Sequence, residues 1–402
     1  MIGWKKTSLA ALALAVGLLN VQPSEACLYC NAVSLTFCEE IRASDVSIIA
    51  RLIERPAPQE AISADAKETD EIVKAKFEVL EVLSGGKHLK GRKQIEVTYF
   101  GRAKVGSKFL LMGIDPPTVF WSTPIAVTDR AVGYLRGALK LPKDGPQRLT
   151  FFLDHLEDQD EMLARDAYDE FAKAPYDTVK KLKAKMDHGK LIGWIKDVEV
   201  PASRRRLYLT MLGVCGGEAD LPMLEKIITS GDRKAKSGFD ALIGCYLTLK
   251  GAKGLKLIED RFLRSDTIEV INPKTGKTER RKVDYSDTYA AIQALRIQGQ
   301  LGDALSRDRI VASMRLILGR TKLADLVIPD LARWGDWKSM PTMVKLFKEA
   351  NPETTWVRSP VLLYLMACPL PEAQKHLAEL AKIDPDAYER ANAFAPLKPK
   401  TK

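Results

Sequence analysis

Three of the six cysteines lie close together near the start of the chain, in the stretch PSEACLYCNAVSLTFCEE (23–40). Cys27 and Cys30 form a C-x-x-C pair, and Cys38 follows on the same stretch. Cysteines at this spacing can serve as a redox dithiol, a metal site, a lipid-modified residue or a structural disulfide. The neighbouring residues discriminate among these four chemistries.

The residues before the cysteines have the layout of a secretory signal. A short basic segment precedes the eleven-residue apolar run LAALALAVGLL (9–19), which is too short to span a bilayer comfortably. Ser24 and Ala26 place small residues at positions −3 and −1 of a cleavage site after Ala26. We therefore expect residues 1–26 to be a signal peptide and the mature chain to begin at Cys27. The protein would be exported, either periplasmic or secreted, with no transmembrane segment after cleavage.

Most of the cysteine chemistries fit this setting poorly. Haem attachment requires C-x-x-C-H, but Asn31 follows Cys30, and a zinc site lacks a nearby fourth ligand. Lipid modification of Cys27 calls for an apolar residue where Ser24 is found. A thioredoxin-like dithiol needs a preceding strand and a helix N-terminus to lower its thiol pKa, and signal cleavage would remove everything upstream. A disulfide is favoured in an oxidising compartment, where any two of the three thiols can close a short loop that clasps the N-terminus.

No other catalytic or metal-binding motif is recognisable. The sequence has no glycine-rich phosphate loop, no G-x-S-x-G elbow and no H-E-x-x-H pair. None of the four histidines has metal-ligand spacing from another histidine or a cysteine: His88, His155, His188 and His376. We therefore predict a protein that is not an enzyme and that uses no cofactor or metal.

The charge balance bears on the partner. The chain has 62 Lys and Arg against 52 Asp and Glu, a formal net charge of +10. A basic exported protein can meet an anionic surface or an acidic polysaccharide. No basic patch is interleaved with aromatic residues and no nucleic-acid-binding motif is present, so we expect no nucleic-acid partner.

Two clusters of basic residues are candidate contact sites. Arg204, Arg205 and Arg206 fall in the first turn of a predicted helix, where they can brace a neighbouring repeat through its carboxylates or contact a ligand. The second cluster lies in an insertion at 267–286, which we interpret as a solvated loop between repeats or as a basic contact loop. Its candidate binding residues are Lys277, Arg280 and Arg281.

The first third of the mature chain has the pattern of strands. Apolar residues alternate with polar ones, or turn residues bound short apolar runs, in five segments: 44–54, 72–85, 92–101, 107–114 and 117–127. Five strands of this size around one core predict a small β-barrel. A Thr-Asp cap then starts a predicted helix at 128–141.

The segment LTFCEEIRASDVSIIARLIE resembles the opening of netrin-type domains, which include the tissue inhibitors of metalloproteases. The match rests on Phe37-Cys38, Ala43, Asp45-Val46 and Ala50-Arg51. The resemblance implies an OB-type barrel at 27–140. It also implies inhibition through the amine and carbonyl of an N-terminal cysteine, here Cys27, on a protease zinc. This chain departs from the family in having no cysteine between 39 and 214 for the long-range disulfides.

From about residue 150 the sequence predicts pairs of helices. Four segments read as helical hairpins: 203–232, 233–266, 327–353 and 355–386. They resemble HEAT-type repeats, which implies an α-solenoid at 150–390 followed by a disordered basic tail at 391–402. Cys215, Cys245 and Cys368 fall at apolar helical positions, where we expect buried free thiols.

The predicted fold class is thus multidomain, a small OB-like β-barrel followed by a HEAT-like α-solenoid. The favoured function is that of an exported, non-catalytic scaffold that binds a protein partner along its helical repeats. Two alternatives remain: metalloprotease inhibition through Cys27, and thiol–disulfide exchange through Cys27 and Cys30.

Overall fold

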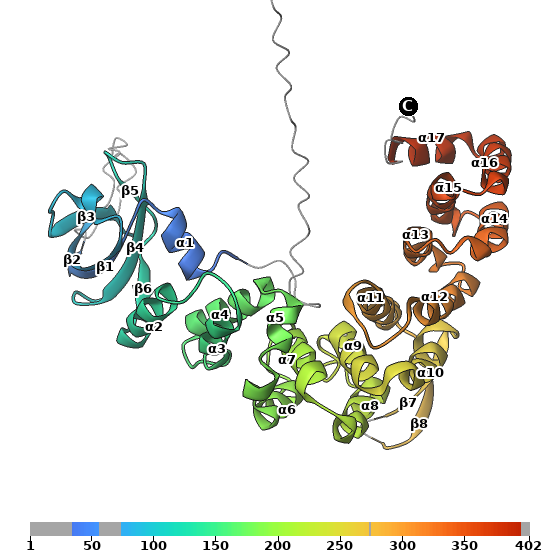
Figure 1. Ribbon diagram of the computed structural model, residues 1–402, viewed down its shortest axis with the longest axis horizontal. Coiled ribbons are helices and arrows are strands. Elements are labelled where there is room, and N and C mark those ends of the chain that lie inside the picture. Colours follow the sequence, from blue (N-terminus) through green and yellow to red (C-terminus); the bar gives the residue numbers. More distant parts are fainter. Residues whose placement is uncertain (1–33, 56–73, 273–274, 395–402) are drawn as a thin grey trace, which may run out of the picture.

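The computed structural model describes residues 34–55, 74–272 and 275–394. A twisted antiparallel sheet lies at one end of the molecule, and a long curved array of helices extends from it (Figure 1). The predicted order, a β part followed by an α part, is therefore confirmed.

The sheet is antiparallel and curls into a nearly closed barrel. Its strands are β1 (Val46–Glu54), β2 (Lys74–Ser84), β3 (Gln94–Thr98), β4 (Lys108–Ile114), β5 (Phe120–Trp121) and β6 (Ile125–Val127). They are ordered β3-β2-β1-β4-β5, and β6 also pairs with β4. The single strand predicted at 117–127 is thus two short ones. Pro124 lies just before β6, and proline cannot donate a ladder hydrogen bond, which limits strands to the segments on either side.

The interior of the barrel follows the predicted alternation. β1 contributes every second residue: Val46, Ile48, Ala50 and Leu52. Three aromatic rings fill the centre, from Phe77, Tyr99 and Phe109, and each pair meets edge to face with centroids 5.4–5.9 Å apart. These residues form a core of their own, separate from that of the helices.

The outer face of the sheet packs on the helical part. Ile49 and Leu110 point away from the barrel interior and belong to the same apolar core as the helices. Helices α1 (Phe37–Ala43), α2 (Asp129–Leu139), α3 (Pro146–Leu153) and α4 (Glu161–Lys173) complete the junction. One continuous core therefore joins the two parts.

The remaining helices form two curved layers. The odd-numbered helices face the concave side in Figure 1, and the even-numbered ones form the convex side. Their bounds are α5 (Tyr176–Lys180), α6 (His188–Lys196), α7 (Ala202–Cys215), α8 (Leu221–Thr229), α9 (Phe239–Lys250), α10 (Leu255–Ile258), α11 (Tyr285–Leu301), α12 (Arg307–Arg315), α13 (Ile328–Arg333), α14 (Met340–Lys348), α15 (Arg358–Ala367), α16 (Pro371–Ile383) and α17 (Pro385–Phe394). The four predicted hairpins match α7/α8, α9/α10, α13/α14 and α15/α16.

Two predictions made for the helical part were wrong in detail. The insertion at 267–286 is a β-hairpin rather than a loop, with β7 (Thr267–Ile271) paired antiparallel to β8 (Thr278–Lys282), and α11 already begins within it. The tail predicted from residue 391 starts too early, because α17 runs to Phe394. Ala387 and Ala391, one turn apart, are buried and hold this helix against the array. Residues 395–402 lie outside the described part.

No helix in the described ranges is both long enough and apolar enough to cross a membrane. The predicted signal peptide at 1–26 lies outside those ranges, so its prediction remains as stated.

Candidate functional site

Only one of the three clustered cysteines lies in the described part of the chain. Cys38, on α1, has a free and fully buried thiol. Burial raises the pKa of Cys38, opposed by a hydrogen bond with Arg148, so this thiol is poorly suited to act as a nucleophile. Cys27 and Cys30 precede the described residues, and the disulfide clasp stays a prediction.

Non-covalent contacts hold the segment that follows those cysteines. The backbone N–H of Phe37 donates to Asp166 Oδ1 at 2.7 Å, and the Tyr134 hydroxyl donates to Asp166 Oδ2 at 2.6 Å. Lys173 forms an ion pair with Glu39, and Arg165 donates to the Ser34 hydroxyl at 3.0 Å. Asp166, Lys173 and Arg165 all lie on α4. The described segment from Ser34 to Glu39 is therefore fastened to the helical array.

A buried ion pair lies beside this attachment. Arg148 on α3 donates from Nε to Glu170 Oε2 at 2.7 Å, and both side chains are almost fully buried. Burial also raises the pKa of Asp166 and of Asp169 to about 6. The junction between barrel and helices thus concentrates carboxyl groups that titrate close to neutral pH.

The three adjacent arginines all engage neighbouring elements. Arg204 reaches back to α4 and the loop before it, pairing with Glu161 at 2.9 Å and Glu157 at 3.3 Å. Arg206 reaches forward to Asp240 at 2.9 Å on α9. These pairs agree with the bracing role considered for the triplet.

The hydrogen bonds of Arg205 were not predicted from the sequence. It is 2% exposed and donates only to backbone carbonyls, those of Ile195 (2.9 Å), Lys234 (2.9 Å) and Ala235 (3.1 Å). It thereby ties the C-terminal turn of α6 to the loop that precedes α9. Carbonyls near a helix C-terminus attract cations, which explains how a guanidinium is tolerated there without a carboxylate.

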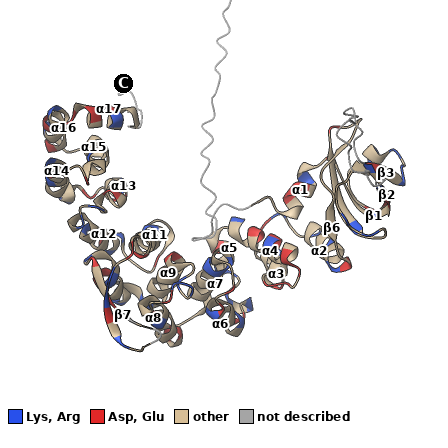
Figure 2. Cartoon of the chain, turned by 180° about the vertical axis from the view of Figure 1, so that it is seen from behind, with Lys and Arg blue, Asp and Glu red and all other residues tan. Residues whose placement is uncertain are grey.

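The second predicted basic cluster lies on the hairpin, apart from the arginine triplet. Arg281 pairs with Glu279 at 2.8 Å, and Arg280 donates to the Thr267 hydroxyl at 3.2 Å. Figure 1 places this hairpin beside α8 and α10. Basic and acidic residues are interspersed along the helical array (Figure 2).

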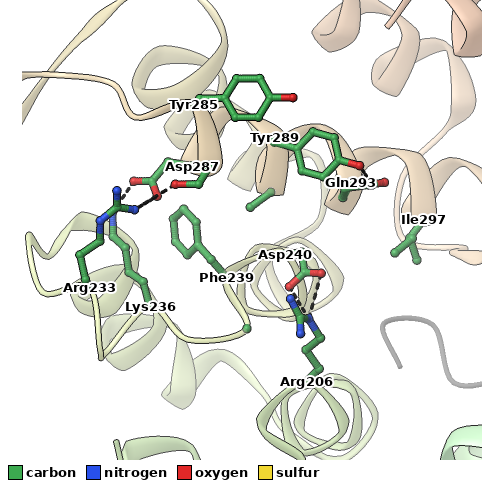
Figure 3. A pocket seen from close by; sticks show the side chains of 13 residues that line it. Arg206, Arg233, Lys236, Phe239, Asp240, Tyr285, Asp287, Tyr289, Gln293 and Ile297 are labelled. Atoms are coloured by element: carbon green, nitrogen blue, oxygen red, sulfur yellow. Dashed lines mark hydrogen bonds and ion pairs between the residues drawn. The ribbon is translucent and has the colours of Figure 1, made fainter. Parts of the chain in front are cut away.

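A cavity of about 700 Å³ opens on the concave side between α7, α9 and α11 (Figure 3). Tyr285 and Tyr289 line one side of it. Their rings stack with centroids 6.0 Å apart and an interplanar angle of 14°, and the residues are 57% and 39% exposed. Phe239 and Ile297 add apolar surface to the lining. We call this cavity the concave pocket.

The charged groups of the concave pocket are paired with one another. Arg206 pairs with Asp240, while Arg233 and Lys236 both reach Asp287, at 3.3 and 2.9 Å. Lys236 is buried with its Nζ 4.6 Å from the centroid of the Phe239 ring, a cation–π contact. These pairs hold the charged side chains of the pocket walls in place. The two tyrosine rings are then the main surface of the pocket that is open to a ligand.

Sequence reasoning missed the two tyrosines for an identifiable reason. Tyr285 falls in the stretch assigned to the insertion, and its relation to Tyr289 depends on α11 starting at residue 285. The signal was present in YSDTY (285–289), because aromatic residues four positions apart lie on one face of a helix.

The described residues contain no group of three or more His, Cys, Asp or Glu side chains arranged to hold a metal ion. Two of the histidines contact aspartates: His188 Nε2 lies 2.9 Å from Asp220 Oδ1, and His155 Nδ1 lies 2.9 Å from Asp158 Oδ2. The concave pocket presents aromatic rings, an amide and paired charges. No protein-family model matches the chain, and no match to it was found among curated proteins.

Proposed function

We propose that this chain is an exported, non-catalytic binding protein in which an OB-like barrel of the netrin type precedes a HEAT-like α-solenoid. Its concave pocket would receive a segment of a protein partner. The observation that carries the proposal is the exposed pair of stacked tyrosines, Tyr285 and Tyr289, over a rigid cavity on the concave side. The strand order β3-β2-β1-β4-β5 and the two layers of paired helices support the two fold assignments.

Tyrosine rings on a fixed frame are efficient binding anchors. They bury a large area on contact, lose little rotamer entropy and offer a hydroxyl to the partner's backbone. The Tyr289 hydroxyl already accepts a hydrogen bond from Gln293 Nε2 at 2.6 Å, which restrains its ring. The surrounding ion pairs also exist before binding, so little ordering is needed when the partner arrives. The charges of Arg206, Lys236 and their partners cancel locally, so an apolar or aromatic side chain would fit better than a charged one.

Site-specific crosslinking in the full chain tests this proposal. A photoreactive phenylalanine analogue at position 289 should give a discrete adduct with one host protein, and Tyr285→Ala should suppress it. The matched control carries the same analogue at position 383, where Ile383 is also exposed but lies at the end of α16. The same adducts from both positions, or an adduct at 289 that is insensitive to Tyr285→Ala, would contradict the proposal.

The two alternatives predicted from sequence depend on Cys27 and Cys30. Neither residue lies in the described part of the chain, and no described side chain adds to a protease-inhibiting or dithiol function. The concave pocket therefore supports the binding proposal better than either.

A further inference from the structure

A second cavity lies among the outer helices, between the end of α12 and α14, and has a volume of about 420 Å³. Its lining differs in kind from that of the concave pocket, because it has three cations, three hydroxyls and only one carboxylate. Those groups are Arg315, Lys338 and Lys345, Thr321, Ser339 and Thr342, and Glu349. We call it the outer pocket.

Asp336 holds one cation of the outer pocket, Arg315, in place. Arg315 Nε donates to Asp336 Oδ2 at 2.8 Å, and the Ser339 hydroxyl donates to the same oxygen at 2.6 Å. Burial alone would raise the pKa of Asp336, but the hydrogen bonds from Arg315 and Ser339 hold it below its ordinary value. Asp336 is thus a buried anion that orients the guanidinium. Arg315 Nη1 keeps no hydrogen-bond partner within the described ranges.

The other donors of the outer pocket are not engaged. Lys338 is exposed and has no ion pair or hydrogen bond with any described residue. Lys345 is 3.9 Å from Glu349 on the next turn, a loose surface contact. The hydroxyls of Thr321 and Thr342 likewise make no hydrogen bond within the described part of the chain. In the concave pocket every lining cation is within ion-pair distance of a carboxylate, whereas in the outer pocket Lys338 has no such partner among the described residues.

We propose that the outer pocket binds a tetrahedral oxyanion, a phosphate or sulfate group, through Arg315, Lys338 and Lys345. A planar guanidinium and two ammonium groups can surround such an anion, and the threonine hydroxyls can donate to its remaining oxygens. The cavity is larger than the anion itself, which leaves room for an organic ester. This site is separate from the concave pocket and does not depend on the binding function proposed for it.

Calorimetric titration of the full chain at low ionic strength tests the site, with inorganic phosphate, sulfate, glycerol phosphate and acetate as probes. We expect phosphate and sulfate to bind and acetate to bind at least about tenfold more weakly. Lys338→Ala should weaken phosphate binding by about tenfold or more, as loss of a charge-assisted hydrogen bond predicts. The matched control is Lys375→Ala, because Lys375 is an exposed lysine on α16 that forms no ion pair with another described residue. Tighter binding of glycerol phosphate would identify an ester as the ligand, and equal binding a free ion.

Three results would overturn this inference. The first is the absence of binding by any of the tetrahedral probes at millimolar concentration. The second is an equal loss of affinity in Lys338→Ala and Lys375→Ala, and the third is equal affinity for acetate and phosphate. Either of the last two would mean general attraction to a basic protein. Circular dichroism of each variant checks that the helices are intact, and both lysines are exposed enough for that to be expected.

Discussion

Arg296 on α11 and Asp330 in the first turn of α13 form a two-pronged ion pair, with Nε 3.0 Å from Oδ1 and Nη2 2.6 Å from Oδ2. A related pair joins Arg206 on α7 to Asp240 in the first turn of α9, where Nε lies 2.9 and 3.1 Å from the two carboxylate oxygens. In both pairs, whose members are 34 residues apart in sequence, a concave-side helix is linked to the next one, and the aspartate lies where the helix dipole favours an anion. The curved array is thus braced at these two steps.

Replacing Asp330, the buried partner of Arg296, should lower the free energy of unfolding. Asp330 is fully buried and accepts from Arg333 as well as Arg296, so Asp330→Ala leaves two arginines without their carboxylate. We expect a loss of roughly 3 kcal/mol in the free energy of unfolding, measured by urea denaturation. The control Asp386→Ala, an exposed acid in the first turn of α17, should cost less than about 1 kcal/mol. Equal losses in the two variants would show that the pair does not brace the array.

Gly85 should not tolerate a side chain. It directly follows β2 at φ +65°, and a Cβ there would lie 1.8 Å from the carbonyl oxygen of Asp45. Gly85→Ala should therefore cost more than about 3 kcal/mol, because the backbone at the start of β1 must move. Gly91 is the matched control, since it has φ +76° with nothing within 4 Å, and Gly91→Ala should cost only about 1 kcal/mol. Thermal unfolding of both variants measures the difference, and similar midpoints would refute the steric argument.

The strands were predictable because alternation is a local signal. Val46, Ile48, Ala50 and Leu52 reveal by their period of two that one face of β1 is buried, and the structure places all four inside the barrel. Helix α1 was missed although T-F-C-E (36–39) is a capping box, with Thr36 N donating to Glu39 Oε2 at 2.8 Å. The helix has only seven residues, so its capping residues are the main local signal for it.

The candidate sites were less predictable because they depend on contacts between distant segments. Nothing local distinguishes Arg205, which binds three carbonyls, from Arg204 and Arg206, which bind carboxylates. The 34-residue interval shared by Arg206/Asp240 and Arg296/Asp330 was a usable signal, but it becomes meaningful only once the repeat length is known. The outer pocket combines the end of α12 with α14, and neither segment alone suggests an anion site.

Arg205 should be harder to replace than its neighbours. Arg205→Ala removes the donor to three buried backbone carbonyls, so we expect the free energy of unfolding to fall by more than about 3 kcal/mol. Arg205→Lys should recover only part of this loss, because an ammonium group cannot span the three acceptors. Lys234→Ala, at an exposed position in the same loop, should change stability by less than about 0.5 kcal/mol. Urea midpoints for the three variants check this order. Full recovery by lysine would show that charge alone matters.

Asp169 should make the molecule less stable as the pH rises towards neutrality. Burial raises the pKa of Asp169 to about 6 in the folded chain, above the value of about 3.9 expected when unfolded. Between these two values the folded state binds more protons, so the contribution of this group to stability is lost progressively from about pH 4 to pH 6. Asp169 makes no hydrogen bond or ion pair with any other described residue, so Asp169→Asn removes the charge at little structural cost.

The variant should therefore be more stable than the wild type at pH 7.5, by roughly 1–3 kcal/mol, and nearly equal to it at pH 4. Urea midpoints measured at half-unit steps between pH 4 and pH 7.5 give the comparison. Asp386→Asn, at an exposed position, is the control and should leave the pH profile unchanged. Asp166 should continue to titrate in the variant, because its own pKa is also raised to about 6 by burial, so the wild-type slope is reduced rather than abolished. A variant less stable than the wild type at pH 7.5 would mean that the Asp169 carboxylate stabilises the junction through Arg165 and Lys173, the cations that lower its pKa.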